Sequence, residues 1–176
     1  MNLDIGSSPS RHEHAMQAQL VRSDRAVTSD AASGGEPRAT GQCLCGAVRY
    51  EVRGPLRDVL LCHCVECRRW GGYVGAFTSV RLEHFSLDGE DALRWVASPG
   101  SDRHARRGFC GECGSSLFWQ PDGSERINIA AGTLDRPTGL EIAGHWYTHQ
   151  AGDFDEVPPD GLPRDSELSS YEIPWR

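Results

Sequence analysis

The chain has 176 residues and a formal net charge of −7, and 38% of its residues are hydrophobic. That length is enough for one domain with a core of its own. The acidic balance argues against a general nucleic-acid-binding surface, and no apolar run of about 18 residues could cross a membrane. All 18 lysine-or-arginine positions hold arginine, which excludes a lysine Schiff base and lysine-bound pyridoxal phosphate.

Three segments differ in composition. Residues 1–40 are rich in serine, alanine, glycine and charge without a sustained apolar pattern, which predicts a disordered N-terminal extension. Residues 41–165 are expected to form the folded domain, and residues 166–176 a C-terminal tail. No secretory signal is recognisable, so we expect a cytoplasmic protein with reduced thiols. Residues 151–176 contain two arginines and seven acids, so this end carries a charge of −5.

From Gly41 onward, short apolar segments alternate with turn signals. Strands are expected at residues 46–54, 59–61, 73–80, 85–87, 92–97, 116–120, 126–131 and 140–147, with one helical turn at 65–70. Strands at intervals of about ten residues, without a long amphipathic helix, predict a mostly antiparallel all-β domain. Its core is expected to include Trp95, Trp119 and Trp146.

The chain contains seven cysteines, which fall into three clusters. They are Cys43 and Cys45; Cys62, Cys64 and Cys67; and Cys110 and Cys113. Their odd number and the two Cys-x-Cys pairs, which close on themselves only with strain, argue against disulfides. Zinc is the expected partner, because it takes several thiolates in tetrahedral geometry.

The first and third clusters together supply a complete four-thiolate zinc site. Cys43 and Cys45 are two residues apart, so on a strand they point to the same face. Cys110 and Cys113 form a zinc knuckle followed by Gly114. Such a site would staple the start of the domain to a point about 65 residues later, so its loss is expected to unfold the domain.

Cys62, Cys64 and Cys67 then remain, one ligand short of a closed tetrahedron. Catalytic zinc sites typically keep such an open position, where a substrate thiol could bind and become ionised. Two alternatives stay open. A distant His104, His145 or His149 could close the site and make this zinc structural, or all seven thiols could form a single cluster.

Three motifs resemble the glutathione-dependent formaldehyde-activating enzyme family, which also includes centromere-protein-V-like proteins. They are Gly41-Gln-Cys43-x-Cys45-Gly46, Cys62-His63-Cys64-x-x-Cys67-Arg68 and Phe109-Cys110-x-x-Cys113-Gly114-Ser115. The stretches Ile129–Asp135 and His145–Tyr147 look like later motifs of that family. The resemblance covers about residues 41–165 and includes every cysteine.

The resemblance implies an Mss4-like fold of small antiparallel sheets held by two zinc ions. It also implies a structural site of Cys43, Cys45, Cys110 and Cys113, and a reactive site of Cys62, Cys64 and Cys67. The implied reaction is that of a carbon–sulfur lyase of the S-(hydroxymethyl)glutathione synthase type, which joins glutathione to formaldehyde.

Arginines are the candidates for binding the carboxylates of glutathione, because guanidinium groups pair with carboxylates in a bidentate manner. Arg68 and Arg69 follow the reactive loop, and Arg103, Arg106 and Arg107 precede the second knuckle. They could equally pair with nearby acids or thiolates. His145 could carry a proton or be a hydrogen-bonded structural residue.

Two other functions compete with the enzyme. A zinc-stapled module could bind a protein partner without catalysis, for which the acidic C-terminal end is the motivation. A nucleic-acid-binding zinc ribbon is disfavoured by the charge balance. The sequence does not indicate an oligomeric state.

Overall fold

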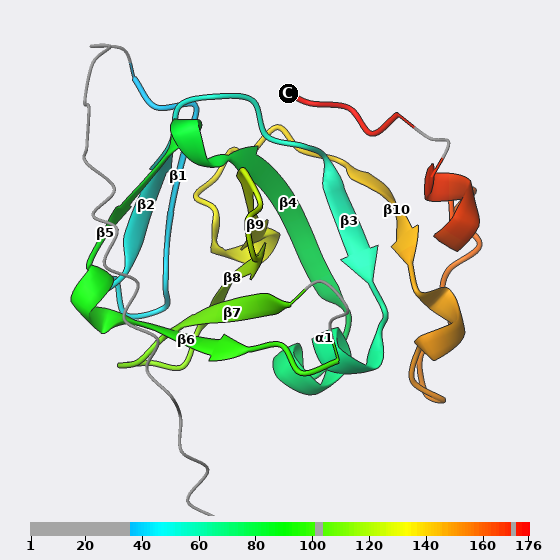
Figure 1. Ribbon diagram of the computed structural model, residues 1–176. Coiled ribbons are helices and arrows are strands. Elements are labelled where there is room, and N and C mark those ends of the chain that lie inside the picture. Colours follow the sequence, from blue (N-terminus) through cyan, green and yellow to red (C-terminus); the bar gives the residue numbers. More distant parts are fainter. Residues whose placement is uncertain (1–35, 101–103, 170–171) are drawn as a thin grey trace, which may run out of the picture.

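Ten strands form two sheets in the part of the chain that the computed structural model describes, residues 36–100, 104–169 and 172–176 (Figure 1). The smaller sheet has the order β1 (Ala39–Gln42), β2 (Arg49–Val52), β5 (Phe85–Asp88), and both of its pairings are antiparallel. The larger sheet has the order β10 (Ile142–Trp146), β3 (Val59–Cys62), β4 (Gly75–Arg81), β9 (Arg126–Ala130), β8 (Ser116–Pro121), β7 (Ala105–Cys110), β6 (Leu93–Ala97). The predicted all-β class is confirmed.

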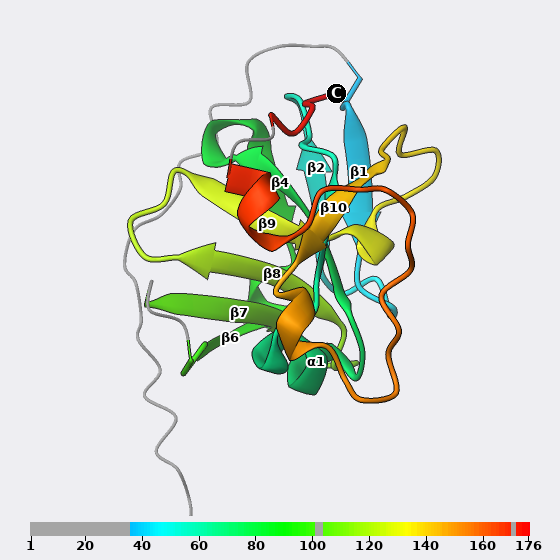
Figure 2. The ribbon, with the colours of Figure 1, turned by 90° about the vertical axis from the view of Figure 1, so that its right-hand side faces the viewer.

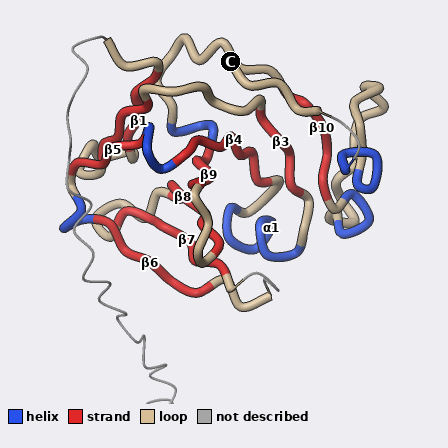
Figure 3. The backbone as a smooth tube through the Cα atoms, turned by 45° about the horizontal axis from the view of Figure 1, so that its top comes forward, coloured by secondary structure: helices blue, strands red, loops and turns tan. Residues whose placement is uncertain are grey.

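Helical segments are short, and the last two of them follow the last strand, β10 (Figure 3). The α-helix α1 (Val65–Gly71) follows β3, and five 3-10 segments complete the described elements. These are η1 (Leu82–His84), η2 (Glu90–Ala92), η3 (Ala131–Thr133), η4 (Thr148–Gln150) and η5 (Asp165–Ser169). Strand β1 begins at Ala39, inside the stretch that we predicted to be disordered, whereas residues 1–35 lie outside the described part.

The main core consists of side chains that the alternating strands turn inward, including Tyr50, Phe118 and Ile129. Cys43 and Cys110 belong to the same buried cluster, so the cysteines near residues 43 and 110 lie at the edge of the core. Trp95 packs against this core and Trp119 is half-buried. The core prediction for Trp146 was wrong, because it ends the edge strand β10 and is 40% exposed.

The pairing of β10 with β3 is parallel, whereas the other pairings between the named strands are antiparallel. It places His145 beside Leu61 and Trp146 beside Cys62. Two segments from distant parts of the chain thereby meet at the end of β3 where the reactive cysteines begin.

The C-terminal segment packs back onto this edge of the large sheet, with η5 over β10 (Figure 2). Leu168 forms a small buried cluster with Leu60 and Ala143. The last residue, Arg176, places its Nε 2.8 Å from both carboxylate oxygens of the buried Asp58. Residues that we expected to form a tail therefore contact the domain. No helix in the described ranges combines the length and apolar character needed to span a membrane.

Candidate metal centres

The structure brings the sulfurs of Cys43, Cys45, Cys110 and Cys113 within 4.8 Å of one another. The Cys43 and Cys45 sulfurs are 3.5 Å apart, and the Cys45 and Cys110 sulfurs 3.8 Å apart. Four sulfurs bound to one zinc at tetrahedral corners lie about 3.8 Å apart, given Zn–S bonds of about 2.3 Å. This donor set therefore fits a zinc ion.

Cys62, Cys64 and Cys67 form a second group, and their sulfurs also lie within 4.8 Å of one another. Strand β3 delivers Cys62, and Cys64 caps the N-terminus of α1 by accepting a hydrogen bond from the Cys67 amide at 3.4 Å. The helix ends at Gly72, whose φ of 82° is readily adopted only by glycine. A seven-residue helix thus holds three sulfurs together.

The three thiols of this group cannot all ionise without a compensating charge. Hydrogen bonds from Cys62 and then Cys67 hold the pKa of Cys64 well below its usual range. The same contact with Cys64 is the largest cause that raises the pKa of Cys62. One thiolate in this group therefore disfavours the next, and a divalent cation is what would allow three thiolates to coexist. The donor set fits zinc, and no described histidine or carboxylate joins it as a fourth ligand.

Arg107 approaches this second cluster from β7. Its guanidinium nitrogens lie 3.8 and 4.0 Å from the Cys67 sulfur, and only 5% of the residue is exposed. The buried Ser98 accepts a hydrogen bond from Arg107 at 3.0 Å, and Glu66 lies 3.4 Å away. Because Ser98 and Glu66 also bond to each other, the guanidinium is held in one position beside the sulfur.

Arg68 and Arg69 lie on α1 in different environments. Arg69 is exposed, and Arg68 is half-buried with an Nε that has no hydrogen-bond partner. Among the described contacts, neither side chain bonds to a cysteine. Among the candidate arginines before the second knuckle, Arg106 bonds to Gln120 and lies over Trp95. Arg103 lies outside the described residues.

His63 points away from the metal ligands on either side of it, as alternation along an extended segment requires. It is 3% exposed, and its Nε2 lies 3.0 Å from Nδ1 of the fully buried His145. Asp155 lies 3.1 Å from the far nitrogen of His63, and Asp160 lies 2.9 Å from the far nitrogen of His145.

The two histidines thus lie in series between two carboxylates, both of which have a lowered pKa. For Asp155 the largest cause is the Tyr73 hydroxyl, and for Asp160 it is His145. This network ties the loop after β10 to the reactive cluster, which the cysteine spacing alone could not indicate.

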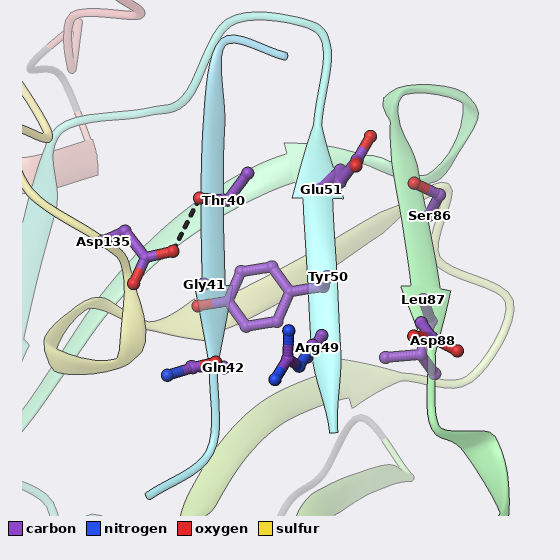
Figure 4. A pocket seen from close by; sticks show the side chains of 10 residues that line it. All are labelled: Thr40, Gly41, Gln42, Arg49, Tyr50, Glu51, Ser86, Leu87, Asp88 and Asp135. Atoms are coloured by element: carbon purple, nitrogen blue, oxygen red, sulfur yellow. Dashed lines mark hydrogen bonds between the residues drawn. The ribbon is translucent and has the colours of Figure 1, made fainter. Parts of the chain in front are cut away.

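The stretch Ile129–Asp135 has a structural role in the described part of the chain. The Thr40 hydroxyl donates to Asp135 at 2.6 Å, and Tyr50 and Thr133 share a bond of 2.7 Å. Both contacts fasten η3 and the residues after it to β1 and β2, beside a cavity of about 480 Å³ (Figure 4). No cysteine lines that cavity.

Two cysteine clusters that could each hold a metal ion, on two mainly antiparallel sheets, define a cysteine-rich β domain. Residues 38–150 match the model of the family described as glutathione-dependent formaldehyde-activating enzyme, and the chain belongs to that family. Its fold is Mss4-like. A crystal structure of a Rhodobacter sphaeroides protein is 27% identical, with a TM-score of 0.45, and covers 58% of this chain and 90% of that one. Among curated proteins, none matches the sequence.

Proposed function

We propose that the protein is a zinc-dependent carbon–sulfur lyase of the S-(hydroxymethyl)glutathione synthase type, which joins a thiol such as glutathione to formaldehyde or another small aldehyde. The observation that carries the proposal is the group of Cys62, Cys64 and Cys67, which no further described metal-ligating side chain joins. Family membership supports glutathione and formaldehyde as the substrate classes. Reduced thiols suit a cytoplasmic location, which we propose as well.

The reaction needs a thiolate at neutral pH. The sulfur electron pair forms the new S–C bond, the carbonyl π pair moves to oxygen, and that oxygen takes a proton in place of the one lost by the thiol. A zinc ion held by the three cysteines would supply a Lewis acid that lowers the pKa of a substrate thiol. The protein's contribution is to hold the sulfurs on the β3–α1 connection and to balance their charge.

Arg107 supports that charge balance. Three thiolates leave a zinc ion with one net negative charge, and the guanidinium beside Cys67 compensates it. Because Arg107 is almost fully buried, its effect on the sulfur is screened less than that of an exposed arginine. The aromatic rings of Trp70 and Phe109 contact each other nearby, and Arg107 lies over Trp70.

We propose a division of labour between the two sites. Cys43, Cys45, Cys110 and Cys113 hold a structural zinc, and the domain of residues 41–165 depends on it. Cys62, Cys64 and Cys67 hold the reactive zinc. Arg68 and Arg69 remain candidates for contacts with the substrate.

The test is the rate of hemithioacetal formation from glutathione and formaldehyde, followed by proton NMR with protein carrying a full complement of zinc. We expect acceleration by the wild type and none by Cys64→Ser. If no acceleration occurs with glutathione, N-acetylcysteine or 2-mercaptoethanol, the proposed activity is wrong and a non-catalytic module becomes the better account.

A further inference from the structure

A second cavity, of about 670 Å³, opens where the edge of the large sheet meets the C-terminal segment. Leu60 of β3 and Trp146 at the end of β10 line it, and Trp175 lines it from the C-terminal side. Tyr147, stacked on Trp146, adds another aromatic wall. Trp146, which is 40% exposed, is thus part of the cavity wall.

Two arginines line the same cavity without a carboxylate partner among the described residues. They are Arg57, which precedes β3, and Arg126 at the start of β9. The ion pairs of the described residues involve other arginines. Arg126 lies over the ring of Trp175 at 4.7 Å.

Arg57 is only partly satisfied. One of its terminal nitrogens donates to the Phe77 carbonyl at 2.9 Å, and its Nε is buried without a hydrogen-bond partner. Burial, and secondly the charge of Arg126, lowers the pKa of Arg57 to about 10. Two guanidinium groups that repel each other in one partly desolvated cavity favour the entry of an anion.

Two acids, Asp165 and Glu172, also line the cavity, so its formal charge is balanced. Asp165 accepts hydrogen bonds from the backbone and hydroxyl of Thr148. Glu172 is exposed and forms no ion pair among the described residues. In the described contacts neither acid is paired with Arg57 or Arg126.

The cavity and the reactive cluster lie on the same side of β3. Leu60 and Cys62 are two residues apart and so share a face, and Trp146 is the strand partner of Cys62. The Arg57 guanidinium bonds to Phe77, the strand partner of Leu60, whereas Gly75 is the partner of Cys62. The Leu60–Phe77 pair and the Cys62–Gly75 pair are two residues apart along the strand, or about 7 Å.

That separation corresponds to about two or three residues of extended peptide. A molecule of this size could place a carboxylate at Arg57 and Arg126, its body along Leu60 and Trp146, and its thiol at the cysteines. The arginine forks suit carboxylates, and the aromatic walls suit the flat peptide groups between.

We propose that this cavity is a carboxylate-binding site, in which Arg57 and Arg126 hold the acidic end of a small peptide-like thiol. The inference rests on the proposed function for the identity of that thiol, but the carboxylate site itself does not depend on it. It makes the two arginines specificity-determining residues that select carboxylated thiols over neutral ones.

Calorimetric titration of the zinc-loaded full chain tests the proposal. The probe is S-methylglutathione, which keeps both carboxylates and cannot form a thiolate. We expect Arg126→Gln and Arg57→Gln each to weaken binding by about tenfold, because each removes a charged hydrogen bond. Arg126 is exposed, so its replacement leaves the fold intact even if Arg57→Gln disturbs it. Arg53→Gln, on the small sheet and paired with Glu51, is the matched control and should bind as the wild type does.

The diethyl ester of S-methylglutathione, which lacks both free carboxylates, should bind weakly to all variants alike. No binding of S-methylglutathione by the wild type, equal binding by Arg126→Gln, or equal binding of acid and ester would each overturn the proposal. If the acid binds in an arginine-dependent way but no thiol reacts with aldehyde, the carboxylate site stands and the proposed enzyme function fails. If catalysis occurs and the arginine variants keep the wild-type KM for glutathione, the proposed enzyme function stands and the carboxylate site fails.

Discussion

The guanidinium of Arg107 lies 3.8 Å from the sulfur of Cys67, although 40 residues separate them in the sequence. This contact gives the reactive cluster a buried positive charge that its own loop does not provide. It connects β7, which carries Cys110 of the first cysteine cluster, to the second cluster. The two clusters are therefore linked through one strand.

Replacement of Arg107 by glutamine should weaken the second site selectively. We expect a loss of activity of at least about tenfold and easier removal of one zinc by a chelator, because the thiolates lose a charge partner. Arg107→Lys should recover part of the activity, since lysine restores the positive charge but not the planar set of guanidinium N–H donors. Chelation monitored with a chromogenic zinc indicator gives the measurement.

Arg106→Gln is the control for that experiment. Arg106 comes immediately before Arg107 on β7. Its side chain points to the other face, where it bonds to Gln120. It should release zinc at the wild-type rate. Equal release by wild type and Arg107→Gln would show that Arg107 has no electrostatic role at the cluster.

Loss of the first zinc site should unfold the domain. Cys110 is fully buried within the main core, and its partners Cys43 and Cys45 precede β2. We expect Cys110→Ser to lack cooperative thermal unfolding by circular dichroism, because the staple between the two sheets is gone. A folded, cooperative Cys110→Ser variant that binds only one zinc would reverse the assigned roles of the two sites.

The histidine chain should stabilise the loop that follows β10. Replacing His145 by alanine leaves His63 with a buried, unpaired nitrogen, which costs about 1–3 kcal/mol of the free energy of unfolding. Residues 151–163 should also exchange their amide hydrogens faster, since Asp160 loses its partner. Denaturant unfolding and hydrogen exchange measure the two effects.

The exposed His149 provides a matched control, and its replacement by alanine should change stability by less than about 0.5 kcal/mol. Faster amide exchange throughout the domain in His145→Ala, instead of only in residues 151–163, would contradict a specific role for the histidine network.

Arg176 should contribute to stability from the end of the described chain. Its removal leaves the carboxylate of Asp58, which is 2% exposed, with the Glu141 amide as its one hydrogen-bond partner among the described residues. We expect Arg176→Ala to lower the free energy of unfolding by about 1–3 kcal/mol. The exposed pair of Arg53 and Glu51 should contribute less than about 1 kcal/mol, so Arg53→Ala serves as the comparison. Equal effects of the two variants would show that burial of Asp58 does not matter.

Most strands and the cysteine clusters could be predicted from the sequence because both depend on local spacing. Alternation of apolar and polar residues predicted the faces of β2 and β9, and Cys-x-Cys and Cys-x-x-Cys spacings reflect how far a single turn can bring two sulfurs. Strand β7 was not among the expected strands. Strand β1 was missed at Ala39 and Thr40, which lack any apolar alternation. Its pairing with β2, and not its own sequence, makes it a strand.

Long-range neighbours could not be read in this way. Nothing in the sequence indicates that β10 pairs in parallel with β3, and this pairing is what brings His145 to His63 and Trp146 to Cys62. The same limit explains the wrong core prediction for Trp146. An aromatic in an alternating segment indicates a strand face, but whether another layer covers that face depends on the fold.

The central claim is that the two cysteine clusters hold zinc ions with different roles. Zinc content per chain, measured by mass spectrometry together with circular dichroism, tests it most directly in wild type and Cys64→Ser. We predict two zinc ions for the wild type and one for Cys64→Ser, with the fold retained. An unfolded Cys64→Ser variant, or a wild type that binds a single zinc, would contradict the account.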